Sequence, residues 1–118
     1  MNDATLIFEI LLRNNLFMDK IDNLIKNTHE LKDIPRMVFF IIELLEQYTL
    51  HCGYNIKLSV EEMYKLLELY RIYILSKFER ESNVYKINIK EFIDIYNTCA
   101  KLSVKKIKLI KKINFFCC

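Results

Sequence analysis

The sequence contains very few of the residues that build tight turns and phosphate-binding loops. Its 118 residues include one glycine, Gly53, and one proline, Pro35. Two-residue β-hairpin turns depend on glycine for positive φ angles, so this composition argues against a sheet protein. Glycine-rich loops that hold nucleotide phosphates are excluded as well, because they need backbone without a Cβ.

Long apolar runs are also missing. Apolar residues make up 53% of the chain and charged residues 28%, which is typical of a folded globular protein. A membrane-spanning helix needs about 20 consecutive apolar residues, whereas the apolar run 37–42 ends at Glu43. Asp3 and Glu9 interrupt the first segment, which therefore lacks the pattern of a signal peptide. We expect an intracellular, cytoplasmic protein with reduced thiols, either soluble or membrane-peripheral.

Alanine is scarce, whereas isoleucine, lysine, asparagine and tyrosine are frequent. This bias is typical of AT-rich genomes, such as those of large DNA viruses, parasites and low-GC bacteria. A small module of this composition would suit a viral structural or host-interacting protein.

Hydrophobic periodicity predicts helices along most of the chain. Apolar residues recur at intervals of three and four, which is the spacing of one helix face. The expected helices cover residues 4–13, 16–27, 34–51 and 60–80, and a further one opens at residue 88. At this length the chain is one domain. The sequence therefore predicts an all-α, single-domain bundle of five or six helices.

The segments 34–51 and 60–80 have the strongest apolar patterns. Residues 37–45 are apolar on nearly every side, which indicates a helix surrounded by neighbours. In the second segment the main inward positions are Met63, Leu66, Leu67, Tyr70, Ile74 and Phe78. We expect these two helices to form a central apolar hairpin.

Polar residues at the expected helix ends have the chemistry of caps. Asp33 is the predicted N-cap of the helix 34–51, and Gly53 can adopt the left-handed conformation that ends it. Ser59 and Glu62 have the spacing of a capping box. Asn88 is predicted to cap the last helix in the same way.

Residues 101–118, KLSVKKIKLIKKINFFCC, differ in charge from the rest of the chain. This tail holds six lysines and no acidic residue, and all fifteen acidic residues lie at or before Asp94. The body, residues 1–100, therefore has a net charge of −3 and the tail one of +6. We expect a helical body followed by a basic amphipathic helix of the same domain, with Ser103 as the one candidate break.

On a helical wheel the tail has an apolar stripe and a basic arc. The stripe contains Leu102, Leu109, Ile110, Ile113 and Phe116. Such a helix can lie in a membrane interface with its lysines near anionic headgroups. The predicted contact residues are Lys101, Lys105, Lys108, Lys111, Lys112, Phe115 and Phe116. Alternatively, the same lysines contact nucleic-acid phosphates, or the apolar stripe packs on the helical bundle of the body and the lysines are solvated.

The chain ends in Cys117 and Cys118, next to lysines and phenylalanines. This pair resembles C-termini that receive two lipid chains, such as the prenylated ends of Rab-family GTPases. The resemblance covers these two residues and implies lipidation of both. Two lipid chains, or one chain with basic residues, suffice for stable anchoring. An unmodified pair and an intermolecular disulfide are the alternatives.

The remaining polar residues do not form a pattern that predicts catalysis. His51, Cys52 and Cys99 lack the spacing of a structural zinc site, and no third group is identifiable to orient a Cys–His nucleophile pair. We interpret Cys99 as a small core residue and His51 as a cation at a helix C-terminus. The sequence predicts no enzyme, no cofactor and no metal site.

We therefore expect a non-enzymatic structural or protein–protein interaction protein whose tail associates with an anionic membrane surface. Its partner would be another protein or a second copy of itself. The first alternative is a nucleic-acid-binding protein that uses the same lysines. The second is an obligate oligomer or capsid component whose tail packs on another subunit.

Overall fold

The computed structural model describes residues 3–50, 55–81 and 87–117, and residues 105–117 as helical backbone alone. These residues form α1 (Asp3–Leu12), α2 (Asn15–Lys26), the 3₁₀ turn η1 (Leu31–Asp33), α3 (Ile34–Leu50), α4 (Val60–Arg80) and α5 (Ile89–Cys117). Within the described ranges there is no strand. The expected all-α bundle is confirmed.

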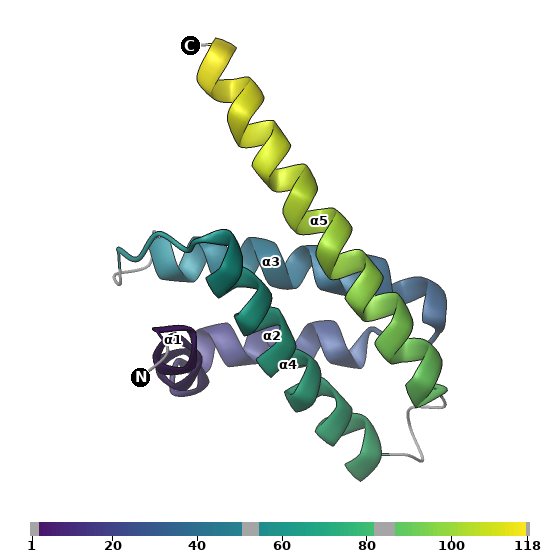
Figure 1. The fold of residues 1–118 in the computed structure, drawn as a ribbon. Helices are drawn as coiled ribbons and strands as arrows, with labels where there is room; N and C mark the ends of the chain where they lie inside the picture. The colour runs from purple at the N-terminus through teal and green to yellow at the C-terminus, as the bar shows by residue number, and fades with distance from the viewer. Residues whose placement is uncertain (1–2, 51–54, 82–86, 118) are drawn as a thin grey trace.

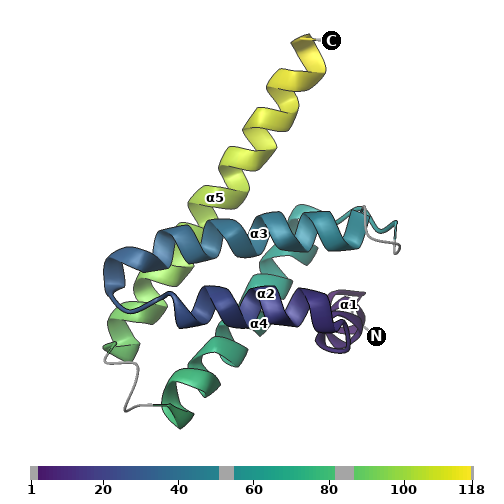
Figure 2. The ribbon, with the colours of Figure 1, turned by 180° about the vertical axis from the view of Figure 1, so that it is seen from behind.

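The helices cross one another in layers around one apolar core (Figures 1 and 2). Helices α2 and α3 lie side by side, and α1 packs across α2 and α4. Helix α5 packs against α3 and α4. Helices α2 and α5 lie on opposite sides of the body, as the views in Figures 1 and 2 agree.

Helices α3 and α4 hold the centre of the core, but they differ from a side-by-side hairpin. Together they supply more than half of the buried apolar side chains. Yet α3 packs mainly on α5 and α2, and α4 packs mainly on α1 and α5. A helix that is apolar on nearly every side needs neighbours on several sides, and α2 and α5 provide them for α3.

Three of the helix starts are fixed by side-chain caps. Asn14 caps α2, because its Oδ1 accepts from the N–H of Phe17 at 3.1 Å. Ser59 and Glu62 form the predicted capping box at the start of α4, with two hydrogen bonds of 3.1 Å. The N–H of Glu91 donates to Asn88 Oδ1 at 3.1 Å. These caps satisfy N–H groups that have no partner within the helix.

Asp33 does not cap α3 as predicted. Its Oδ2 accepts from the backbone N–H groups of His29 and Glu30, at 3.2 and 3.1 Å, and so closes the turn before α3. The N–H of Glu30, followed by that of His29, holds the pKa of Asp33 below its usual value. The other predicted cap, Gly53, lies outside the described residues.

The predicted inward positions of α4 are all buried: Met63, Leu66, Leu67, Tyr70, Ile74 and Phe78. On α5, Phe92 and Tyr96 are fully buried, whereas Ile93, Ile95 and Cys99 are half-buried against the core. The ring of Phe92 contacts Phe78 at 5.1 Å and Tyr96 at 5.6 Å between centroids. Aromatic contacts therefore join α5 to α4.

A polar contact joins α2 to α4. Asp22 Oδ1 accepts from the Tyr73 hydroxyl at 2.8 Å and pairs with Lys77 Nζ at 2.8 Å. Burial, followed by the bond to the Asp22 carboxylate, raises the pKa of Tyr73 to about 12. The phenol therefore remains a donor at neutral pH and fixes the crossing of the two helices.

Two buried tyrosines differ in one hydrogen bond, and we expect them to respond differently to loss of the hydroxyl. Tyr96 donates to the Leu67 carbonyl at 2.6 Å, whereas the Tyr70 hydroxyl has no partner within the described part of the chain. Tyr96→Phe should lower the free energy of unfolding by about 1 kcal/mol, and Tyr70→Phe should leave it unchanged or raise it. Urea unfolding of both variants measures the difference, and equal losses would contradict it.

Candidate functional site

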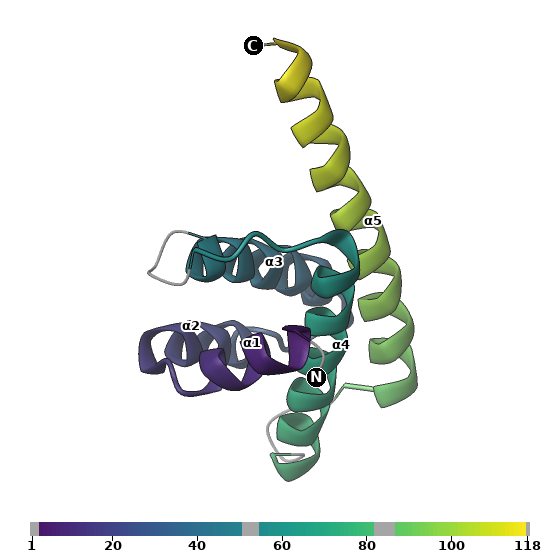
Figure 3. The same ribbon diagram turned by 60° about the vertical axis from the view of Figure 1, so that its left-hand side comes forward.

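Helix α5 continues beyond the body without a break. It runs from Ile89 to Cys117, and the candidate break at Ser103 is helical. Figure 3 shows its C-terminal half rising past all the other helices. Val104 is buried, and it is the last residue of α5 whose side chain the structure describes. The thirteen residues that follow it extend about 20 Å at the rise of an α-helix.

The predicted contact residues of the tail share this one helix. Lys101 is exposed. Lys105, Lys108, Lys111, Lys112, Phe115, Phe116 and Cys117 lie on the described helical backbone, and their side chains are outside the described part of the structure. Cys118 lies outside the described residues altogether. The expected helical conformation of the tail is therefore present, and its contacts stay a prediction.

Hydrogen bonds from α4 hold α5 in place up to the start of the tail. Arg71 Nη1 donates to Asn97 Oδ1 at 2.7 Å, and the Tyr96 hydroxyl bonds to the backbone of α4. The Tyr64 hydroxyl donates to the Lys101 carbonyl at 3.5 Å. Because α4 holds successive turns of α5, the direction of the tail is set by the packing of the body.

The stripe of the tail begins on a different face of α5 from the one that packs on the body. The body-facing residues are Phe92, Tyr96, Ala100 and Val104, all buried. Leu102 is 63% exposed, and at 100° per residue it lies about 140° around the helix from the middle of that face. Leu109, Ile113 and Phe116 follow Leu102 in its helical register. These four positions of the tail stripe therefore lie away from the buried face, whereas Ile110, eighteen residues after Phe92, lies in register with it.

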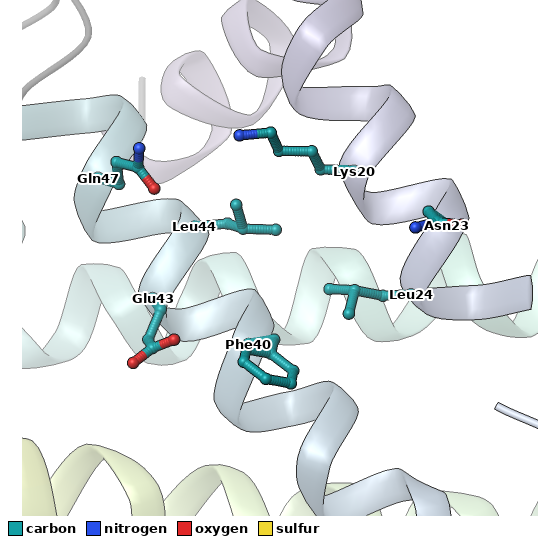
Figure 4. Close-up of a pocket in the computed structure, with 7 residues that line it drawn as sticks. All are labelled: Lys20, Asn23, Leu24, Phe40, Glu43, Leu44 and Gln47. Atoms are coloured by element: carbon teal, nitrogen blue, oxygen red, sulfur yellow. The ribbon is translucent and has the colours of Figure 1, made fainter. Parts of the chain in front are cut away.

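A groove lies between α2 and α3, on the side of the body away from α5. Its cavity volume is about 280 Å³. Its lining residues are Lys20, Asn23, Leu24, Phe40, Glu43, Leu44 and Gln47. Figure 4 shows Leu24, Phe40 and Leu44 between the two helices and Glu43 on the outer side of α3. Sequence periodicity did not reveal this groove, because it arises from the pairing of two helices.

The charged groups around this groove differ in their partners. Lys20 Nζ lies 5.4 Å from the centre of the Tyr48 ring, and the Arg36 guanidinium lies 5.6 Å from that of Phe40. Both cations thus face aromatic rings. Glu43 is exposed and forms no ion pair within the described residues. The groove lining therefore combines apolar side chains with one cation, Lys20, and one carboxylate, Glu43.

Of His51, Cys52 and Cys99, Cys99 is the one that lies within the described residues. Cys99 is half-buried, and burial raises the pKa of its thiol. His51 and Cys52 lie outside the described residues. Across residues 3–50, 55–81 and 87–104, no three histidine, cysteine, aspartate or glutamate side chains are grouped to bind a metal.

None of the helices searched in the described ranges has the length and apolarity that crossing a bilayer requires. Comparison with protein-family models, with curated proteins and with solved structures gives no significant match. The functional proposal therefore depends on the geometry of α5.

Proposed function

We propose that this protein is a non-enzymatic structural or interaction module that attaches to anionic membrane surfaces through the tail half of α5. The observation that supports this most directly is the continuation of α5 past the body as one helix. Its apolar stripe starts at the exposed Leu102, on a face that the body does not cover. An amphipathic helix with lysines on its polar side suits the plane of a membrane interface.

The charges of the body and the tail support attachment by the tail alone. Each lysine near an anionic surface contributes about 1 kcal/mol, and burial of each large apolar side chain contributes about 2 kcal/mol. The net charge of residues 1–100 is −3, so anionic headgroups repel the body while they attract the tail. This opposition favours an orientation in which the body stays in water and is free to contact a protein partner.

Vesicle flotation of the full-length protein tests this proposal. We expect flotation with vesicles of phosphatidylcholine and phosphatidylserine, and little with phosphatidylcholine alone. Flotation should decrease only partly at high salt, because insertion of the stripe is not screened. Intact mass of the same sample, purified from its native host, reports whether Cys117 and Cys118 carry lipid.

Nucleic-acid binding by the same lysines is the competing outcome. It would appear as binding to short RNA or DNA that weakens steeply with salt, with no flotation. Deletion of residues 115–118 separates the two, because it removes two aromatic side chains and no lysine. Membrane attachment should be lost in this variant, whereas phosphate binding should survive. Absence of flotation with the unmodified full-length protein would contradict the membrane proposal.

A further inference from the structure

Four apolar residues of α5 are spaced seven positions apart and form what we call the heptad seam: Ile95, Leu102, Leu109 and Phe116. An apolar repeat of seven residues keeps one line of a helix in contact with a second helix, as in a coiled coil. The seam starts on the body, where Ile95 is half-buried and Leu102 is mostly exposed, and it continues along the tail. Beside it, Glu91, Asp94 and Thr98 are exposed as well. A second helix therefore has access to this side of α5.

The polar residues of the seam decide the direction of a second copy of this helix. Four residues before each apolar position, α5 carries Glu91, Thr98, Lys105 and Lys112. If two copies of α5 paired in parallel, each residue would face its own counterpart. Lys105 would then meet Lys105 and Lys112 would meet Lys112, and these like charges would repel. A parallel pair of α5 helices is therefore disfavoured.

An antiparallel pair brings opposite charges together. The acidic residues of α5, Glu91 and Asp94, lie in its first two turns, whereas the six lysines of the tail follow later. If two copies overlap along the whole of Ile89–Cys117, Asp94 of one lies within one helical turn of Lys108 and Lys112 of the other. The tail of each copy also approaches the body of the other, and their net charges of +6 and −3 attract. Charge complementarity therefore favours the antiparallel direction.

We propose that this protein forms a two-fold dimer in which the heptad seams of two α5 helices pack antiparallel. Leu102 lies about 140° around α5 from the middle of the face that packs on the body, so a helix on the seam lies on the outer side of α5. Figure 3 shows the tail half of α5 beyond the other helices. Because the two copies present the same surface to each other, the assembly closes at two chains.

Two features of the seam limit the strength of this dimer. One of its two repeating positions is polar, and Lys101 and Lys105 of the two copies meet near the middle of the pair. We therefore expect a concentration-dependent equilibrium between one and two chains. The inference is independent of membrane attachment, although both use Leu102 and the apolar side of the tail. Because this side cannot contact a helix and a bilayer together, vesicles containing phosphatidylserine should compete with dimerisation.

Sedimentation velocity of the full-length protein over a range of concentrations tests the dimer. The weight-average mass of the wild type should rise with concentration and level off at that of two chains. Leu102→Gln should raise the dissociation constant about tenfold or more, because each dimer loses the burial of two leucines. Ile72→Gln is the matched control, since Ile72 is 55% exposed on α4 and lies outside the seam. Far-UV circular dichroism confirms that both variants are folded.

Charge reversal tests the antiparallel direction. Asp94→Lys should raise the dissociation constant about tenfold, because the contact of Asp94 with the tail lysines occurs twice in a two-fold dimer. Asp19→Lys is the matched control, since Asp19 is exposed on α2 and the charge change is the same. Addition of Lys108→Glu and Lys112→Glu to Asp94→Lys should restore dimerisation, because both members of each contact are then reversed.

A wild type that is monomeric at all concentrations would overturn the proposal, and so would a mass that grows beyond two chains. It would also be wrong if Leu102→Gln dimerised like Ile72→Gln, if Asp94→Lys dimerised like Asp19→Lys, or if the triple variant showed no recovery. The membrane proposal fails separately. Asp94→Lys keeps every residue of the tail, so it should still float with vesicles of phosphatidylcholine and phosphatidylserine whatever its effect on dimerisation.

Discussion

Replacement of Lys105, Lys108 and Lys112 by glutamine is expected to lower partition onto vesicles containing phosphatidylserine by about 100-fold. Three lysines near an anionic surface contribute about 3 kcal/mol in total, and every 1.4 kcal/mol is a factor of ten. The three positions belong to the basic arc of the tail and leave its stripe intact. Equilibrium co-sedimentation with vesicles at low salt measures the change.

The control carries the same loss of charge on the body. Lys26, Lys57 and Lys90 are exposed and lie outside the tail, so their replacement by glutamine should change partition little. A similar loss in both triple variants would show that net charge alone governs binding. The proposed role of the tail would then be wrong.

Phe92→Ala is expected to lower the free energy of unfolding by about 3–5 kcal/mol, which is the cost of deleting a buried aromatic side chain. Phe92 is fully buried, and its ring contacts Phe78 and Tyr96. Small domains have a total stability of about 5–15 kcal/mol, so this variant should lose a large share of its stability. Urea unfolding followed by circular dichroism measures the loss.

Leu102→Ala provides a control on the same helix. Leu102 is mostly exposed and belongs to the tail stripe, so its truncation should change stability by at most about 0.5 kcal/mol. A large loss would mean that the stripe packs on the body. The membrane proposal requires that it does not.

Local sequence patterns predicted much of the fold. The start of α4 was predictable because Ser59 and Glu62 satisfy each other within one turn, and its buried positions follow from the period of the helix. Such features involve residues a few positions apart. The approximate helix ranges and the all-α class could be inferred for the same reason.

Features set by contacts between distant segments were not predictable in this way. Periodicity identified α3 and α4 as core helices but not the neighbours of each. Asp33 was assigned to α3, although its carboxylate bonds to the preceding backbone. In both cases several partners satisfy the same local chemistry, and the packing of the whole chain selects one.

The candidate site was likewise predictable from the sequence only in part. The amphipathic character of the tail was visible on a helical wheel, but the angle between its stripe and the buried face of α5 was not, since it requires knowing that Phe92 and Val104 meet the body. The groove between α2 and α3 joins residues from two helices, and neither helix alone indicates it.

Because α5 is one uninterrupted helix, the angle between the face that packs on the body and the tail stripe is fixed. An insertion of one residue after Val104 would rotate the tail by about 100° relative to the body, and one of seven residues by only about 20°. If a surface binds the tail stripe, the number of residues between the body and the tail therefore determines which side of the body faces away from that surface. Insertions or deletions in α5 keep the orientation of the body relative to the tail only when their length is close to a whole number of helical turns.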